Sequence, residues 1–353
     1  GDLLNTYTLG IDIGSTTVKI AILDEQENLL FADYERHFAN IQETLADLLE
    51  KAQGKLGEMT LCPVITGSGG LTLANHLEIP FVQEVIAVAS SLEHFLPQTD
   101  VAIELGGEDA KILYLSQGMD LRMNEACAGG TGAFIDQMAT LLKMSADEMN
   151  KAAEQAQRTY TIASRCGVFA KSDVQPLINQ GARTEDIAAS IYKAVVNQTI
   201  AGLAQGRPIQ GNILYLGGPL TFSKTLRRSF DKTLGVTGTL PENSLLFVAM
   251  GAAFYADEVL DLHEVAQRLD NYSATATYVS LPPLFADKQE HEEFHARHMK
   301  ASVPCLPFGA DCGPVHIGID SGSTTIKLVV IDQNANILFE SYRPNLGNPI
   351  PLV

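Results

Sequence analysis

The sequence has few basic residues. Its 24 lysines and arginines stand against 42 aspartates and glutamates, which gives a formal net charge of -18. Such a chain repels a phosphate backbone unless its basic residues gather in one patch, and the sequence has no such patch. We therefore expect no nucleic-acid partner.

Cysteines and long apolar runs are also scarce. The 5 cysteines lack the density of a secreted disulfide scaffold, so we expect reduced thiols and, for any pair, a metal site rather than a bridge. No apolar run approaches the roughly 20 residues that a bilayer span requires, and the first residues lack the order of a signal peptide. We expect a cytoplasmic protein without membrane contact, and its 353 residues suggest a two-lobed α/β body.

One stretch of the sequence occurs twice. Residues 9–31 and 317–339 share twelve identities in 23 aligned positions, and their turns read GIDIGSTTVK and GIDSGSTTIK. Each copy has an apolar run, a Gly/Ser/Thr turn, a second β-branched run and a turn containing asparagine, which predicts strand, turn and strand. A match of this quality indicates an internal repeat.

Between the two copies, strands alternate with helices. Helical spacing and end signals predict helices over residues 42–56, 80–97, 132–143, 183–206 and 244–260. Composition and pattern together divide the chain into five segments. We expect lobe I at 1–97, lobe II at 98–248, a helix returning to lobe I at 249–262, a linker or extension at 263–314, and the truncated start of a second repeat unit at 315–353.

Three glycine-rich turns, each fed by an apolar strand, suggest one ligand held by several loops. They lie at residues 12–17, 104–109 and 216–221. Glycine N–H groups, hydroxyls and a lysine can bind phosphate, whereas Asp12 and Glu104 can hold a hydrated Mg²⁺ or orient a water. One such turn alone is usually only a tight turn. Neither GxxxxGK[ST] nor a strand-to-helix GxGxxG occurs at these turns, which excludes P-loop and dinucleotide-binding Rossmann folds.

The order of these elements resembles the actin, Hsp70 and sugar-kinase ATPase superfamily. DIGSTTVK is similar to its first phosphate loop, ELGGEDAK to its second, and LYLGGPLTFSKTL to its adenosine loop. The resemblance implies a ribonuclease H-like α/β fold, in which two lobes with mixed β-sheets flanked by helices clamp Mg²⁺ and ATP or ADP. It also implies catalytic roles for Asp12 and Glu104, with Mg²⁺ held by Asp12 through water. The implied nucleotide contacts are Gly14, Ser15, Thr16, Thr17, Lys19, Gly106, Gly107, Asp109, Gly217, Gly218 and Pro219.

Two cysteine motifs narrow this resemblance. NEACAGGTGAFIDQM and IASRCGVFAKSDV place Cys127 and Cys166 just before expected helix starts. An isolated cysteine is more often a packing residue than a ligand. Both motifs, however, closely resemble those of the activators of 2-hydroxyacyl-CoA dehydratases and of the related benzoyl-CoA reductase ATPase subunits, the BadF/BadG/BcrA/BcrD type. The resemblance covers roughly residues 9–260.

This narrower resemblance implies that Cys127 and Cys166 ligate a [4Fe–4S] cluster. Because such a cluster takes four thiolates, two units would share it, either in a homodimer or in a pseudo-dimer with the second repeat of a large tandem activator. It also implies an ATP-dependent electron donor that is reduced by ferredoxin or flavodoxin and acts on a CoA-thioester dehydratase or related reductase. We expect no nucleotide at residues 320–327, because the partner turns of that copy are missing.

Two other functions stay open at this point. A small-molecule kinase of the same fold would need an alcohol as phosphate acceptor and no iron. A non-catalytic nucleotide-sensing module of a larger enzyme is suggested by the second copy and by Glu104 and Glu108, which stand where the activators have Asp and Gln.

The other cysteines and the histidine group favour no further site. Cys62 is expected in the core, and Cys305 and Cys312 lack two further ligands at a convincing spacing. The spacing of His291, His295 and His298 favours a solvated helix face over a zinc site.

Overall fold

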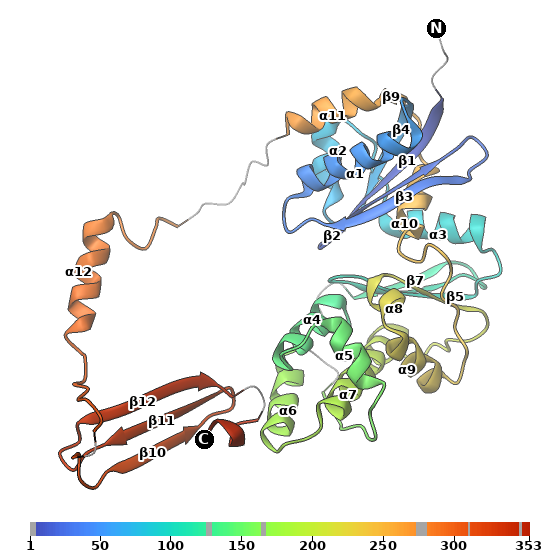
Figure 1. Cartoon of the computed structure of the whole chain (residues 1–353). Coiled ribbons are helices and arrows are strands. Elements are labelled where there is room, and N and C mark those ends of the chain that lie inside the picture. Colours follow the sequence, from blue (N-terminus) through green and yellow to red (C-terminus); the bar gives the residue numbers. More distant parts are fainter. Residues whose placement is uncertain (1–4, 125–128, 164–166, 273–280, 310, 346–347) are drawn as a thin grey trace. The chain divides into compact units, whose positions relative to one another are not determined.

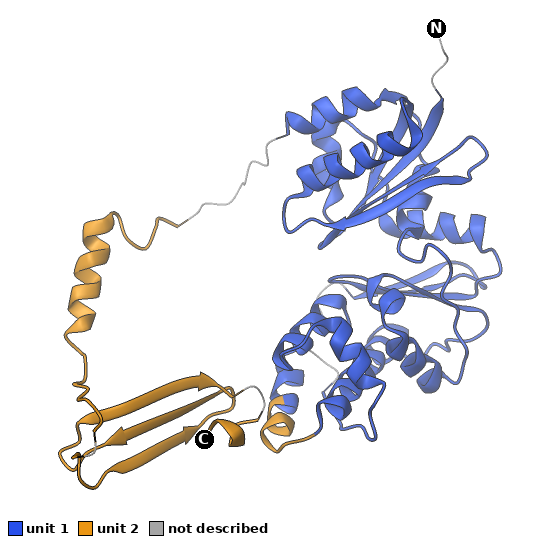
Figure 2. Ribbon diagram, in the orientation of Figure 1, with its two compact units in different colours: residues 1–174, 183–273 blue, residues 175–182, 274–353 orange. Residues whose placement is uncertain are grey.

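The structure is a computed structural model (Figure 1). It describes residues 5–124, 129–163, 167–272, 281–309, 311–345 and 348–353. The chain divides into two compact units, residues 1–174 with 183–273, and residues 175–182 with 274–353 (Figure 2). The first unit holds two lobes, and the second holds the repeated strands.

Lobe I is built on a mixed five-stranded sheet with the order β3-β2-β1-β4-β9. Strand β1 pairs antiparallel with β2 and parallel with β4. The strands are β1 (Thr6–Ile13), β2 (Thr17–Leu23), β3 (Leu29–Arg36), β4 (Thr60–Thr66) and β9 (Leu260–Asp261). The apolar faces of three helices complete the core of this lobe, namely α1 (Ile41–Leu56), α2 (Gly70–Leu77) and α11 (Leu262–Asp270).

Lobe I extends beyond residue 262, where the sequence pattern predicts its end. Residues 263–270, expected in a linker, form most of α11. Its buried Leu262, Val265 and Leu269 recur at helical spacing and join the core of lobe I. Three apolar residues among charged ones give a weak periodic signal, and their burial depends on the surface that α1 and α2 offer.

Lobe II is built on a four-stranded sheet with the order β7-β6-β5-β8. Its strands are β5 (Val101–Leu105), β6 (Ala110–Tyr114), β7 (Asp120–Asn124) and β8 (Ile213–Leu216). Its helices are α4 (Gly132–Leu141), α5 (Ala146–Ala153), α6 (Gly167–Asn179), α7 (Thr184–Thr199), α8 (Gly218–Phe222) and α9 (Lys224–Leu234), and a π-helical turn, Ile200–Ala204, continues α7. The mixed α/β fold expected from the sequence is confirmed.

Two helices lie between the lobes, α3 (Glu84–Phe95) and α10 (Phe247–Ala253) (Figure 1). Their side chains share one core with residues of both sheets, such as Val64 of β4 and Ala102 of β5. Glycines allow backbone-to-backbone packing here: a methyl group on Gly10 of β1 would lie 1.7 Å from the carbonyl oxygen of Ala249 in α10. The lobes are therefore joined through a tightly packed layer.

The second unit contains the sheet β10-β11-β12, which we call the repeated hairpin. Its strands are β10 (His316–Ser321), β11 (Thr325–Ile331) and β12 (Ile337–Pro344). Its register copies that of β1-β2-β3: Asp320 faces Lys327 as Asp12 faces Lys19. The prediction of strand, turn and strand in both copies is confirmed, although every residue of β10 is exposed.

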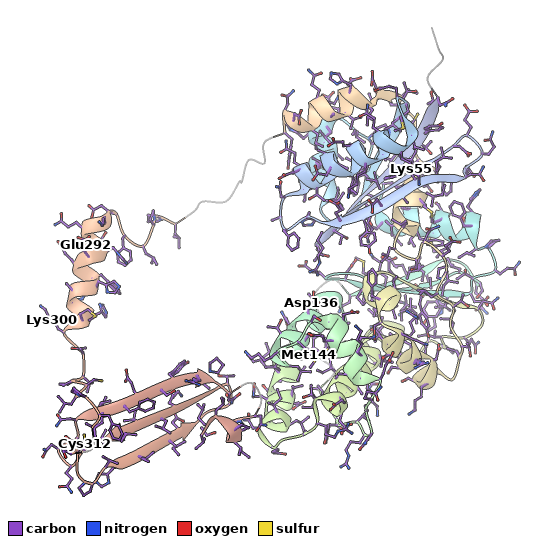
Figure 3. All side chains as sticks on the ribbon, in the orientation of Figure 1. Lys55, Asp136, Met144, Glu292, Lys300 and Cys312 are labelled. Atoms are coloured by element: carbon purple, nitrogen blue, oxygen red, sulfur yellow. The ribbon has the colours of Figure 1, made fainter. Side chains whose placement is uncertain are left out.

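Helix α12 (Lys288–Met299) precedes the repeated hairpin and has no buried residue. The side chains of Glu292 and Lys300 project away from the ribbon there (Figure 3). The three histidines of this segment thus lie on an exposed helix. None of the described helices is long and apolar enough to cross a membrane.

Candidate nucleotide site

The first glycine-rich turn connects β1 and β2. The Gly14 N–H donates to the Thr17 carbonyl (2.9 Å), which closes a tight turn between the two strands. Asp12, at the end of β1, is 2% exposed, and its Oδ2 lies 3.6 Å from Lys19 Nζ, on the facing position of β2. The alternation of the strand therefore presents a carboxylate and an ammonium group together beside the turn.

The second glycine-rich turn connects β5 and β6 and faces the first. The Gly106 N–H donates to the Asp109 carbonyl (2.8 Å). A methyl group on Gly107 would lie 2.9 Å from Ser15 Oγ and 2.9 Å from Thr16 Oγ1. The hydroxyls of the first turn therefore lie in close contact with the backbone of the second turn.

Helix α4 begins directly on the second turn. The Gly132 N–H donates to the Gly106 carbonyl (2.9 Å), and the Ala133 N–H donates to the Gly107 carbonyl (2.7 Å). The first N–H groups of a helix have no partner within the helix, so the turn supplies acceptors for them. The position of α4 is therefore tied to the backbone of the second turn.

The third glycine-rich turn lies between β8 and α8, next to the second. Gly217 has φ +88, and a methyl group there would lie 2.0 Å from the carbonyl oxygen of Leu105. The turn needs glycine both for this left-handed conformation and for the close approach to β5. Gly218 and Pro219 then open α8, and Pro219 Cγ would lie 3.4 Å from a methyl group on Gly132.

A buried lysine binds three carboxylates behind the second turn. Lys111 Nζ lies 2.7 Å from Asp109 Oδ2, 3.4 Å from Glu104 Oε1 and 3.4 Å from Glu84 Oε1. Burial by itself lowers the pKa of Lys111, but the attraction of these carboxylates outweighs it and holds the pKa above its usual range. Lys111 is only 2% exposed and stays charged at neutral pH.

Glu84, Glu104 and Asp109 share the single charge of Lys111, and this affects the pKa of Glu84. Burial is the largest cause that raises the pKa of Glu84 to about 7, and the charges of Asp12 and Glu104 add to it against the opposing effect of Lys111. Within the described residues, this site therefore holds more negative charge than its lysines neutralise, as expected where a cation is to be bound.

Two buried carboxylate oxygens find no hydrogen-bond partner among the described residues, Asp12 Oδ1 and Glu104 Oε2. Such oxygens are costly to bury unless a ligand or water satisfies them. In the described part of the chain, no group of three metal-ligating side chains is arranged to bind a metal ion directly. The two oxygens fit hydrogen bonds from the waters of a hydrated Mg²⁺.

Sequence reasoning missed two residues at this site, Glu84 and Gly67. Glu84 opens a helix that reads as an ordinary packing helix, so its role depends on tertiary packing. Gly67 has φ +100, and a methyl group there would lie 2.6 Å from Asp12 Oδ1. The GSGG turn after β4 was the signal that could have identified Gly67.

The two cysteines of the motifs, Cys127 and Cys166, lie outside the described residues. The helices expected after them are present: α4 begins at Gly132, and α6 begins at Gly167. Cys62 is half-buried in β4. Burial raises the pKa of its thiol.

An exposed ion pair also joins the lobes. Arg36 Nη2 of β3 lies 3.2 Å from Oδ2 of Asp136 on α4, which Figure 3 labels. The three glycine-rich turns adjoin one another, and the buried carboxylates of Asp12 and Glu104 lie beside them. The chain is a two-lobed α/β protein with mixed sheets, as expected from the sequence.

Comparison with known proteins specifies the family. The model of the BadF/BadG/BcrA/BcrD ATPase family matches residues 9–256, which is more than half of the chain, and the chain belongs to this family. The 2-hydroxyisocaproyl-CoA dehydratase activator of Clostridioides difficile is 30% identical over 256 residues, which cover 71% of this chain and 94% of that protein. The (R)-2-hydroxyglutaryl-CoA dehydratase activating ATPase of Acidaminococcus fermentans is 28% identical over 258 residues, with coverage of 72% and 98%.

Solved structures agree with this assignment. The crystal structure of component A of the Acidaminococcus fermentans (R)-2-hydroxyglutaryl-CoA dehydratase superposes with a TM-score of 0.63 at 26% identity and covers 74% of this chain and 99% of its own. The Clostridium difficile activator of 2-hydroxyisocaproyl-CoA dehydratase was solved with bound ADPNP. It superposes with a TM-score of 0.61 at 27% identity, and the match covers 77% of this chain and 100% of that one.

Proposed function

We propose that this protein is an ATP-hydrolysing activator that passes a low-potential electron to a 2-hydroxyacyl-CoA dehydratase or a related CoA-substrate enzyme. The observation that carries the proposal is the attachment of α4 to the second phosphate turn through the Gly132 and Ala133 N–H groups. The motif with Cys127 runs directly into this helix. The turn that the proposal assigns to the phosphates is thus hydrogen-bonded to the helix that follows the Cys127 motif in the sequence.

The nucleotide half of the proposal assigns roles to the facing turns. The N–H groups of the first and second turns and the hydroxyls of Ser15 and Thr16 hold the phosphates, and Lys19 adds a positive charge. Asp12 and Glu104 accept hydrogen bonds from the waters of Mg²⁺ or from the attacking water. Mg²⁺, when bound, neutralises the charge that develops on the phosphates.

The substitution of glutamate at position 104 is compatible with this role. Glu104 Oε1 is anchored 3.4 Å from Lys111, and the other oxygen has no partner among the described residues. One oxygen is thus fixed while the other remains available to a water. The longer side chain uses its extra length to reach Lys111, so we expect hydrolysis to be retained.

The redox half of the proposal assigns Cys127 and Cys166 to a shared [4Fe–4S] cluster. Such a cluster supplies one-electron transfer at low potential when bound. Two thiols make half of its ligand set, so two copies of this chain, or a second repeat, complete it. Helix N-termini follow both motifs and favour negative charge on thiolate and sulfide. Ferredoxin or flavodoxin would reduce the cluster.

The cluster assignment predicts the behaviour of a double cysteine variant. Anaerobically prepared protein is expected to be brown, and Cys127→Ser with Cys166→Ser is expected to lose nearly all iron and sulfide while it keeps ATP binding. Cys62→Ser is the matched control and keeps its iron, because Cys62 belongs to a strand of lobe I. Unchanged iron content and visible absorption in the double variant would contradict the assignment.

Activity separates this proposal from the alternatives. ATP hydrolysis that needs no added alcohol, together with electron transfer to the dehydratase, is expected. ADP formation that depends on an alcohol and not on iron would indicate a kinase. ATP binding without turnover, with cluster and partner present, would indicate a nucleotide-sensing module.

The proposed role of Asp12 in holding hydrated Mg²⁺ can be tested against Asp320, its equivalent in the repeated hairpin. Asp12→Asn is expected to weaken Mg²⁺-dependent ATP binding by about tenfold or more, because it removes a charge-assisted acceptor. Asp320→Asn changes the corresponding residue of the repeated hairpin, where we expect no nucleotide, and should leave the affinity unchanged. Titration calorimetry with and without Mg²⁺ measures both, and an equal loss in the two variants would place nucleotide at the second copy.

A further inference from the structure

Glu84 is a partly buried acid that has no direct role in binding the phosphates or Mg²⁺. It is the first residue of α3, which packs against α10 and shares a core with both sheets. Its Oε1 lies 3.4 Å from Lys111 Nζ, and its side chain is 21% exposed. Glu84 thus connects the helix between the lobes to the strand that carries the second phosphate turn.

The arrangement around Lys111 is specific in its geometry. An ammonium group has three N–H donors, and three carboxylates from three elements surround this one: Glu84 of α3, Glu104 of β5 and Asp109 of the turn. Lys111 Nζ donates to Glu104 Oε1 (3.4 Å) and lies within ion-pair distance of Glu84 and Asp109. The attraction of Glu84 therefore ties the end of Lys111 to the start of α3.

A structural role alone explains this cluster poorly. One buried lysine needs one well-placed carboxylate, and each further buried acid adds a desolvation cost and repulsion. The raised pKa of Glu84 reflects that cost. Groups held in unfavourable electrostatic surroundings beside a cleft are common at functional sites.

We propose that Glu84 is a positioning residue of the ATPase site, which acts through Lys111 to hold Glu104 in place and links the nucleotide site to helix α3. This inference rests on the proposed ATP hydrolysis. When α3 moves with the lobes, Glu84 moves the end of Lys111, and Lys111 shifts the anchored oxygen of Glu104. The free oxygen of Glu104 then reaches the water only in the lobe arrangement that seats Glu84 on Lys111.

The test compares variants of Glu84 in the full chain. Glu84→Gln keeps the shape but removes the charge, and it is expected to lower kcat for ATP by about tenfold or more, as loss of alignment at a reacting water does. KM and the affinity for ADP should change less than about threefold, since Glu84 reaches the nucleotide only through other residues. Glu84→Asp should restore part of kcat. Glu93→Gln, on the exposed side of the same helix, is the control and should leave kcat unchanged.

Each outcome decides between roles. A fall in kcat with KM and thermal midpoint preserved, and partial rescue by Glu84→Asp, supports positioning. Wild-type kcat in Glu84→Gln overturns it, as does a parallel fall in kcat, nucleotide affinity and thermal midpoint, which indicates a structural role. If the unchanged chain binds ATP but hydrolyses none with cluster and partner present, the proposed ATPase function fails and this role fails with it.

Discussion

Replacement of Lys111 by methionine is expected to lower the free energy of unfolding by about 3–5 kcal/mol at pH 8, as removal of one partner from a buried ion pair does. Methionine fills most of the volume of the lysine side chain, so the loss reflects charge rather than a cavity. Lys111 is 2% exposed and is the cation that Glu84, Glu104 and Asp109 share. Without it, their negative charges lie close together in a site where the Glu104 side chain is only 10% exposed.

The pH dependence of this loss distinguishes charge from packing. In the variant, Glu84 loses the Lys111 charge that opposes the effect of burial, so its pKa lies still further above that of the unfolded chain. The folded state then binds more protons than the unfolded state, so its stability increases as the pH falls. The wild-type protein also gains stability as the pH falls, because Glu84 has a pKa of about 7 in the folded state, so the variant is compared with the wild type at each pH.

Urea unfolding at pH 8 and pH 5 measures this effect. The deficit of Lys111→Met is expected to shrink at pH 5, where Glu84 is protonated and no longer contributes a negative charge. Lys151→Met is the control: Lys151 forms an exposed pair with Asp147, with both side chains 74% exposed, and its removal should change stability by less than about 0.5 kcal/mol at either pH. A deficit that stays constant between the two pH values would contradict the electrostatic explanation.

The same cluster shows which parts of the site could be predicted from sequence. Asp12 and Lys19 face each other across one tight turn, so their proximity follows from strand alternation and the length of the turn. The ladder between β5 and β6 likewise pairs Glu104 with Lys111. Local sequence therefore determines both pairs.

Glu84 was not predictable in this way. It approaches Lys111 because α3 packs between the two sheets, and that packing depends on residues as distant as those of α10. The pairing of β4 with β9 also joins Leu61 to Leu260, nearly 200 residues apart, and follows no local pattern. Periodicity identifies helices and strands, but it does not determine which residues of separate elements meet. The roles of Cys127 and Cys166 stay predictions, since both lie outside the described residues.

The two copies of the repeat allow one substitution to be tested in two environments. Gly10 and Gly318 occupy equivalent positions: Gly10 faces Ala21 in β2, and Gly318 faces Val329 in β11. A methyl group on Gly10 would lie 1.7 Å from the carbonyl oxygen of Ala249, whereas one on Gly318 would meet no described atom within 4 Å. The local sequences match, and only the packing differs.

Gly10→Ala is therefore expected to destabilise the first unit by about 3 kcal/mol or more, at the upper end of the range for overpacked cores. Helix α10 has little room to retreat, because a methyl group on its Gly251 would already lie 1.7 Å from the carbonyl oxygen of Ala87 in α3. Gly318→Ala should change stability by less than about 0.5 kcal/mol, since an exposed strand accommodates alanine.

Unfolding curves for both variants, together with ATP affinity, test this difference. Gly10→Ala is expected to weaken ATP binding as well. Asp12 lies two residues after Gly10 in β1, so a shift of this strand also displaces Asp12. Gly318→Ala should leave ATP affinity unchanged. Equal destabilisation by both substitutions would mean that β10 is packed as closely as β1. A harmless Gly10→Ala would mean that α10 can move away from the sheet, and that the layer between the lobes is looser than its glycines indicate.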